Sequence, residues 1–176
     1  AYQQDQVAFY GNYAEFAQAQ SNVENAVIAF KDNRVVMAIA SNECTADLDS
    51  AVETLLAADP ISNQFEITAM NIEYDFGLKA DDVTSYKGLK SNDNGDAGLV
   101  LAIQPAAGKA QDVMDTLKTY QQDQVAFYGN YAEFAQAQSN VENAIIDGGD
   151  DLVVMVIASN DCSSDLTSAV KDVLGK

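Results

Sequence analysis

The chain has 176 residues, 48% of them hydrophobic, which is enough for an ordinary domain with a core. Acidic residues outnumber basic ones 27 to 9, and the formal net charge is −18 at pH 7. Such a surface repels nucleic acid phosphates and anionic lipids, so we expect neither as a partner. No apolar run in the sequence is long enough to predict direct membrane insertion. Histidine, the commonest general base and transition-metal ligand, is absent from the sequence.

A long internal repeat organises the chain. Residues 2–26 and 120–144 both read YQQDQVAFYGNYAEFAQAQSNVENA, an offset of 118 residues. The match continues without a gap, and 41 of the 57 aligned positions are identical. The period predicts that residues 1–58 are the C-terminal half of a preceding repeat unit and that residues 59–176 are one complete unit. We therefore expect a fragment of a longer tandem array, with a leader or anchor upstream.

The complete unit shows alternating strand and helix patterns after a linker at residues 59–62. In chain order the patterns predict a weak helix at 69–76, strands at 83–91 and 98–104, a long helix at 107–127, a short helix to 138, strands at 144–147 and 152–159, and a C-terminal amphipathic helix. This order predicts an α+β domain: an antiparallel sheet of two hairpins with helices packed on one face, (α)ββααββα in each 118-residue unit.

Two acidic turns are candidates for a cation. Asp93 and Asp96 flank Gly95 in the first hairpin turn, but the loop lacks the alternating ligands and terminal glutamate of a calcium-binding hand. The turn DGGDD at 147–151 corresponds to AFKDN at 29–33, where a lysine makes calcium binding implausible. Both turns are therefore interpreted first as hairpin turns, with Asp93 and Asp96 kept as a weak cation candidate.

The two cysteines, Cys44 and Cys162, occupy equivalent places just before a predicted helix. A thiol at a helix N-terminus can be reactive, but a catalytic thiol would need a histidine partner. The alternative is a small buried residue at a strand-to-helix corner. Because each unit carries one cysteine, we expect no disulfide within a unit.

An aromatic cluster surrounds Gly11 and again Gly129. It contains Tyr10, Tyr13, Tyr128 and Tyr131, with phenylalanines beside them. Tyrosine suits a carbohydrate or peptide platform, which makes these four residues a possible binding surface. The alternative is that the rings fill the junction between helix and sheet.

Several segments of the unit resemble a bacterial family known as domain of unknown function 4358. They are YDFGLKADDVTSY, the long helix through YQQDQ, and NYAEFAQAQSNVENAII with GGDDLVVMVIASND. The resemblance as a whole covers about residues 71–174. Residues 98–100 depart from the acid that the family places in its second strand. The resemblance implies an exported protein of Gram-positive bacteria, often lipid-anchored or repeated in large surface proteins, and hence an extracellular, cell-surface location. It implies no activity.

These observations predict a non-catalytic repeat module of a surface protein that acts as a spacer or binds a protein or glycan. No catalytic residue, cofactor or metal site is expected. The alternative is a self-assembling structural subunit in which half-units complete one another, and self-association through residues 1–58 is expected. A carboxylate-dependent enzyme is the third hypothesis.

Overall fold

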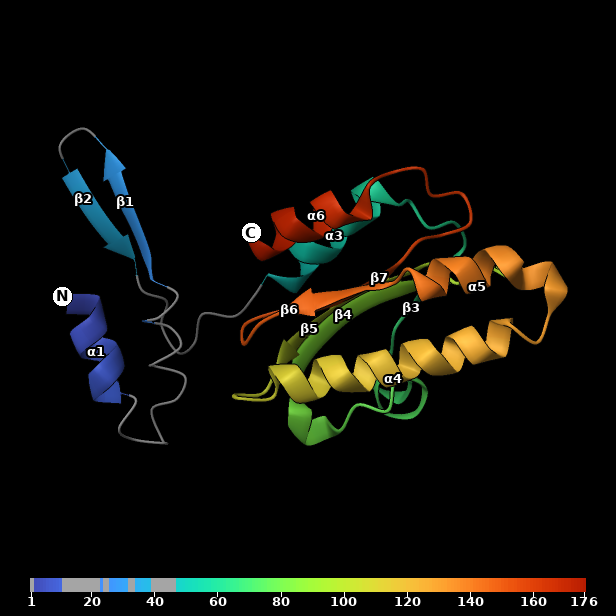
Figure 1. Ribbon diagram of the computed structural model, residues 1–176, viewed down its shortest axis with the longest axis horizontal. Helices are drawn as coiled ribbons and strands as arrows, with labels where there is room; N and C mark the ends of the chain where they lie inside the picture. Colours follow the sequence, from blue (N-terminus) through green and yellow to red (C-terminus); the bar gives the residue numbers. More distant parts are fainter. Residues whose placement is uncertain (1, 11–22, 24–25, 32–33, 39–46) are drawn as a thin grey trace. The chain divides into compact units, whose positions relative to one another are not determined.

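The computed structural model describes residues 2–10, 23, 26–31, 34–38 and 47–176. The chain divides into two compact units, Ala1–Thr45 and Ala46–Lys176 (Figure 1). In the first unit, helix α1 (Tyr2–Tyr10) precedes a hairpin of β1 (Val27–Lys31) and β2 (Arg34–Ala38). These two strands pair antiparallel as a two-stranded sheet.

The second unit is built around five antiparallel strands in the order β3-β4-β5-β7-β6. Its elements are α3 (Leu48–Ala58), β3 (Gln64–Glu66), the π-helical turn η2 (Asn71–Asp75), the 3₁₀ turn η3 (Ala80–Asp82), β4 (Val83–Ser91), β5 (Leu99–Pro105), α4 (Ala110–Tyr128), the 3₁₀ turn η4 (Ala132–Phe134), α5 (Ala135–Glu142), β6 (Ile145–Gly148), β7 (Val153–Ile157) and α6 (Leu166–Leu174). The predicted α+β class is confirmed. The short strand β3 adds to the two predicted hairpins.

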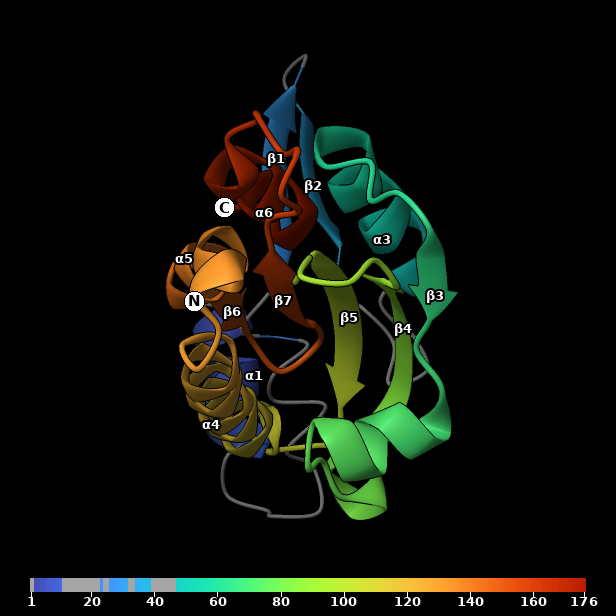
Figure 2. The ribbon, with the colours of Figure 1, turned by 90° about the vertical axis from the view of Figure 1, so that its right-hand side faces the viewer.

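Helices cover both faces of this sheet. On one face Leu101 and Met155 lie in a core cluster under α4 and α5. On the other face Val100 and Val154 lie in a second cluster under α3 and α6 (Figure 2). The expectation that all helices pack on one face is therefore wrong. The cause lies in β5 and β7, whose continuous apolar runs present hydrophobic side chains on both faces, so that both need cover.

Helix α3 belongs to the second unit, which begins at Ala46 and not at the repeat boundary after residue 58. Its residues Ala51, Val52 and Leu55 are buried in the cluster that α6 also covers. Both helices begin with an aspartate cap. The Asp47 carboxylate accepts a hydrogen bond from the Ser50 amide, and Asp165 accepts one from the Thr167 amide.

The end of α3 is tied to the end of β7 by a buried carboxylate. Asp59 is 1% exposed and accepts hydrogen bonds from the Ser159 amide at 2.7 Å and from the Ser159 hydroxyl at 2.6 Å. Ile61, two residues further on, is also buried. The segment 59–62, predicted as a linker, thus contributes two of its four residues to the core.

We expect the fragment 46–176 to unfold cooperatively and the shorter fragment 59–176 to be about 5 kcal/mol less stable, because the loss of α3 uncovers one face of the sheet. Urea titrations followed by circular dichroism measure both. Within 46–176, Leu55→Ala should cost about 2–5 kcal/mol. The half-buried neighbour substitution Leu56→Ala is the matched control and should cost less. Equal stability of the two fragments would show that α3 is dispensable.

Candidate ligand-binding site

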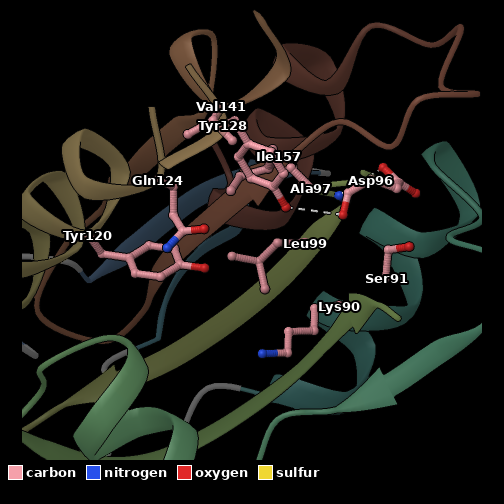
Figure 3. A pocket seen from close by; sticks show the side chains of 11 residues that line it. Lys90, Ser91, Asp96, Ala97, Leu99, Tyr120, Gln124, Tyr128, Val141 and Ile157 are labelled. Carbon is pink, nitrogen blue, oxygen red and sulfur yellow. Dashed lines mark hydrogen bonds between the residues drawn. The ribbon is translucent and has the colours of Figure 1, made fainter. Parts of the chain in front are cut away.

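A small pocket opens between α4 and the sheet, at the end where β4 meets β5. Its volume is about 130 Å³. Side chains from α4 lean over strand residues such as Leu99, and the turn residue Asp96 lies opposite (Figure 3). The lining residues are Lys90, Ser91, Asp96, Ala97, Gly98, Leu99, Tyr120, Gln124, Tyr128, Val141 and Ile157. Sites for whole small molecules typically have about 300–1,000 Å³, so this pocket suits one substituent of a larger ligand.

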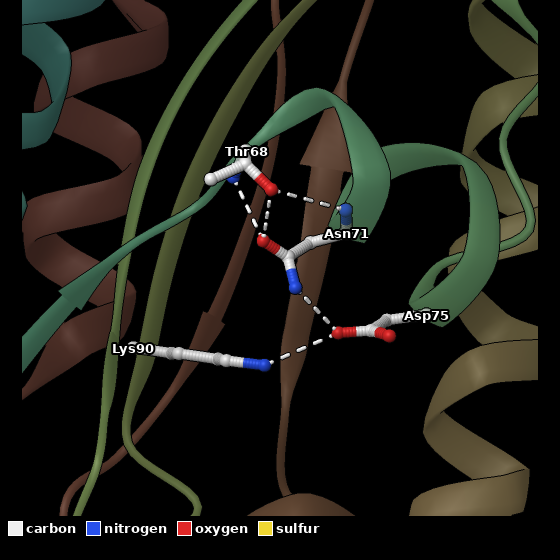
Figure 4. Close-up of polar contacts among 4 residues, drawn as sticks. All are labelled: Thr68, Asn71, Asp75 and Lys90. Carbon is white, nitrogen blue, oxygen red and sulfur yellow. Dashed lines mark hydrogen bonds and ion pairs between the residues drawn. The ribbon is translucent and has the colours of Figure 1, made fainter.

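Lys90 brings the one cationic group of the pocket lining. Its ammonium lies 3.2 Å from a carboxylate oxygen of Asp75 and 5.4 Å from the ring centre of Phe65. Asn71 donates a second hydrogen bond to Asp75 at 2.8 Å, and its own oxygen accepts from Thr68 (Figure 4). This chain of contacts holds the Lys90 charge against β3 and η2.

The pKa of the Asp75 carboxyl is lowered by this arrangement. Partial burial alone would raise it, but the hydrogen bonds from Asn71 and Lys90, together with the Lys90 charge, outweigh that effect. Asp75 is therefore ionised at neutral pH and partly neutralises Lys90. The pocket consequently has little net positive charge with which to attract an anion.

Two tyrosines and a glutamine line the α4 side of the pocket. Burial raises the pKa of Tyr120 far above its ordinary value, helped by Tyr128 and Asp75, and burial also raises the pKa of Tyr128, with Asp96 contributing. Both hydroxyls are thus neutral across the physiological range. The Tyr128 hydroxyl donates to the Asp96 backbone oxygen at 3.4 Å. Within the part of the chain that the structure describes, no hydrogen bond involves the Tyr120 hydroxyl or the side-chain amide of Gln124. These two groups are available to a ligand.

An aromatic rim adjoins the pocket through Tyr128. We use this name for Phe127, Tyr128, Tyr131 and Phe134, whose neighbouring ring centres are 5.2–6.1 Å apart. Phe127 is 50% exposed and Tyr131 is 44% exposed, whereas Tyr128 and Phe134 are half-buried. The cluster therefore anchors two rings and presents the other two to solvent.

The turn between β4 and β5 supports this rim. Gly95 has φ +77°, and a Cβ atom at this position would lie 2.6 Å from the Phe134 ring, so the ring rests directly on the glycine backbone. Asn160 donates from its side chain to the Gly95 oxygen at 2.9 Å and from its amide to Asp96 at 3.0 Å. The residues that follow β7 thus fix the turn on which the rim stands.

Both aspartates of the weak cation candidate already accept hydrogen bonds. Asp93 accepts from Ser62 at 3.1 Å and from Asn63 at 2.8 Å, while Asp96 accepts from the amides of Gly98 and Asn160. Among the described residues, no group of three or more histidine, cysteine or acidic side chains is placed to hold a metal ion. Through these hydrogen bonds the two carboxylates stabilise the turn between β4 and β5.

Cys162 is a free thiol at the corner between β7 and α6. Partial burial raises its pKa, with Asp59 contributing, so the thiol is less reactive than an ordinary surface cysteine. Cys44 lies outside the described residues, as does Tyr13. Tyr10 is the last residue of α1, and the structure describes its backbone alone.

A second hollow, of about 440 Å³, lies between η3 and the first half of α4 and is open to solvent. Lys109 bridges two of its carboxylates, Asp82 at 3.2 Å and Asp112 at 2.9 Å. Hydrogen bonds to Asp112 and Asp82 raise the pKa of Lys109. Lys109, Asp82 and Asp112 of this hollow are thus paired with one another, and its lining contains no aromatic residue.

Sequence reasoning identified only part of this site. The structure brings Tyr128 and Tyr131 into the rim and Asp96 into the pocket, whereas Asp93 is not among the pocket lining and bonds Ser62 and Asn63. Tyr120, Gln124 and Lys90 were missed. The spacing of Tyr120, Gln124 and Tyr128 at every fourth position of a helix is the signal that indicates a shared face. Lys90 has no comparable signal.

The family model described as Domain of unknown function (DUF4358) matches residues 58–158. The matched range contains the whole sheet, α4 and α5, and it leaves out α6 and nearly all of α3. No curated protein and no solved structure matches the chain. Among the described helices, none combines the length and the hydropathy that a bilayer-spanning segment requires.

Three glycine substitutions separate the roles of the turn backbone. Gly95→Ala should cost about 2–3 kcal/mol, because it combines a positive φ with a clash against Phe134. Gly108 has φ +73°, but a Cβ atom there would meet no other atom within 4 Å, so Gly108→Ala should cost about 1 kcal/mol. Gly149 has neither a positive φ nor a close neighbour, so Gly149→Ala should leave the stability almost unchanged. Urea unfolding gives the three values, and a Gly95→Ala cost no larger than that of Gly108→Ala would contradict the packing role.

The raised pKa of Tyr120 predicts a loss of stability in alkali. The unfolded chain releases the phenolic proton near its ordinary value of 10.0, whereas the folded chain holds it to higher pH. The stabilisation is therefore complete below pH 10 and declines as the pH rises above it. Tyr120→Phe should match the original chain at pH 7 and show a shallower decline between about pH 9.5 and 11. An unchanged slope in urea titrations would refute this assignment.

Proposed function

The chain belongs to the DUF4358 family, and we propose that it serves as a non-catalytic binding module whose aromatic rim and pocket take a neutral glycan. The observation that carries the proposal is the pair of exposed rings, Phe127 and Tyr131, beside the pocket that contains Tyr120 and Gln124. Aromatic faces pack against the C–H face of a sugar ring, and neutral hydroxyl and amide groups hydrogen-bond its hydroxyls.

The charge of this region favours an uncharged ligand. Residues 120–144 contain Asp123, Glu133 and Glu142 but no lysine or arginine. Lys90, across the pocket, is paired with Asp75 at 3.2 Å. An anionic ligand would face repulsion from the −18 chain without a free cation to receive it. The many glutamine and asparagine side chains suit a polyhydroxylated ligand instead.

The internal repeat supports a role for this surface. In residues 120–144, all fourteen exposed positions are identical to their counterparts in residues 2–26. In residues 145–176, which also have fourteen exposed positions, only four are identical to their counterparts in residues 27–58. Exposed positions normally change more readily than buried ones. The exposed surface of the second half of α4 and of α5 is thus retained where the neighbouring surface has changed, which supports a binding role.

The proposal extends to the setting of the module. We infer that it is a repeated unit of an exported bacterial surface protein, since tandem copies of one binding surface raise avidity for a polymer that repeats the same sugar. Antibody labelling of intact bacterial cells that make the full protein would test this location. Absence of labelling on intact cells with strong labelling after lysis would contradict it.

The expected ligand class can be tested on an array of neutral oligosaccharides with the 176-residue chain. We expect binding to at least one neutral glycan, and Phe127→Ala and Tyr131→Ala should each weaken it about tenfold or more. Tyr74→Ala is the matched control, because Tyr74 is 72% exposed and lies on a different surface turn. Affinity is measured by calorimetry on the glycan that the array identifies.

Two outcomes would contradict the glycan proposal. One is binding only to peptides or charged glycans, and the other is an equal loss of affinity in the Tyr74→Ala control. The coding DNA gives an independent check on the argument from the repeat. Silent codon positions in the two copies of residues 2–26 and 120–144 should differ as often as those of the flanking segments. Identity at the silent positions would point to copying of the DNA instead of retention of the surface.

A further inference from the structure

The hairpin of the first unit reproduces a hairpin of the second. Val27 pairs with Ala38, and Ile28 pairs with Met37. At an offset of 118 residues these become the pairs Ile145 with Val156 and Ile146 with Met155, which are those of β6 and β7. The β1–β2 hairpin therefore has the same register as the β6–β7 hairpin, and β2 is the equivalent of β7.

The two strands differ in their second neighbour. In the second unit β7 lies between β6 and β5, and its pairing with β5 runs from Leu99↔Ile157 to Ile103↔Val153. Among the described residues, β2 pairs only with β1. The backbone groups on its other edge correspond to those that β7 gives to β5. An edge of this kind is a template for a further strand.

The residues of β2 match those of the strand that this edge would receive. β5 reads LVLAI over residues 99–103, and β2 with the next residue reads VVMAI over residues 35–39. Four features agree in order: two branched or large apolar residues, a long unbranched or leucine side chain, alanine, and isoleucine. A second β2 can thus occupy the place of β5 with the alanine and the large residues at the same positions.

The register of this replacement is symmetric. In the second unit Leu101 of β5 lies opposite Met155 of β7. Met37 is equivalent to Met155 by the repeat offset. It is also equivalent to Leu101 when β2 is aligned with β5. Met37 of one copy would therefore lie opposite Met37 of the second copy, and Val36 opposite Ala38. An antiparallel strand pair centred on one residue has a two-fold axis, which is the symmetry of a closed dimer.

The other strands of the chain are poorer occupants. β5 is already paired on both sides, with β4 and β7. The edge strand β3 has only three residues, Gln64–Glu66, all exposed and two of them polar. The edge strand β6 ends in Asp147 and Gly148, which do not match the apolar run of β5.

We propose that two copies of this chain associate through β2, antiparallel and centred on Met37, to form a four-stranded sheet in the order β1-β2-β2-β1. The residues that form the proposed contact all belong to the first unit.

The first test uses the whole 176-residue chain. Sedimentation equilibrium at tens of micromolar should give twice the chain mass of 18.8 kDa. Met37→Lys places two like charges at the axis and should shift the chain to monomer. A mass of 18.8 kDa for the unsubstituted chain at this concentration overturns the proposal.

A second test does not depend on how Met37→Lys affects folding. Opposed residues of an antiparallel pair have Cα atoms about 4.5–5.5 Å apart, within the range of a disulfide. In a chain with Cys44→Ser and Cys162→Ser, Met37→Cys should form an intermolecular disulfide rapidly under mild oxidation. Ile28→Cys, on the opposed strand of the same hairpin, is the matched control and should cross-link much more slowly. Equal rates, or a dimer in which Met37→Cys does not cross-link, would show that the chain associates elsewhere or not at all.

Discussion

The pairing of β5 with β7 at the centre of the sheet is the constraint on which the rest of the second unit depends. The residues of both strands from Leu99 to Ile103 and from Val153 to Ile157 are almost completely buried. Two adjacent strands without a polar face cannot border water on either side, so helices must cover both. α4 and α5 cover one face and support the aromatic rim, while α3 and α6 cover the other. The buried contact between Asp59 and Ser159 ties the end of α3 to the end of β7.

The same end of β7 also positions the candidate site. Ser159 is held by Asp59, and the next residue, Asn160, holds Gly95 and Asp96 in the turn between β4 and β5. That turn receives the Phe134 ring and the Tyr128 hydroxyl. The rim therefore rests on backbone that the core holds in place, although its rings come from α4, from Tyr131 and from η4. A site of this kind is preorganised, because no large movement is needed to present Phe127 and Tyr131.

Local patterns in the sequence were sufficient for most elements and insufficient for their assembly. The strand predicted at residues 83–91 is β4, and the helix predicted at 107–127 is α4 with its start moved to Ala110. The prediction that the helices pack on one face of the sheet was wrong. The number of faces that must be covered depends on β5 and β7 together, because both strands are apolar on both faces. The buried role of Asp59 was missed because a carboxylate beside a proline resembles a turn, and its partner Ser159 is 100 residues away. Tyr128 and Tyr131 were singled out because aromatic residues cluster around Gly129 in the sequence, whereas Lys90 reaches the pocket only through the pairing of β4 with β5.

The repeat and the fold impose different boundaries, and the difference has a structural consequence. α3 and α6 occupy equivalent positions of the repeat, since Leu48 and Leu166 are 118 residues apart. α3 packs on the sheet that follows it in the chain, whereas α6 packs on the sheet that precedes it. Each 118-residue period supplies one such helix, but the sheet seen here uses two. The one apolar stripe of α3 is buried against the sheet that follows it in the chain. The boundary of the packed unit, at Ala46, therefore precedes the boundary of the sequence repeat, after residue 58, by the length of this helix and its cap.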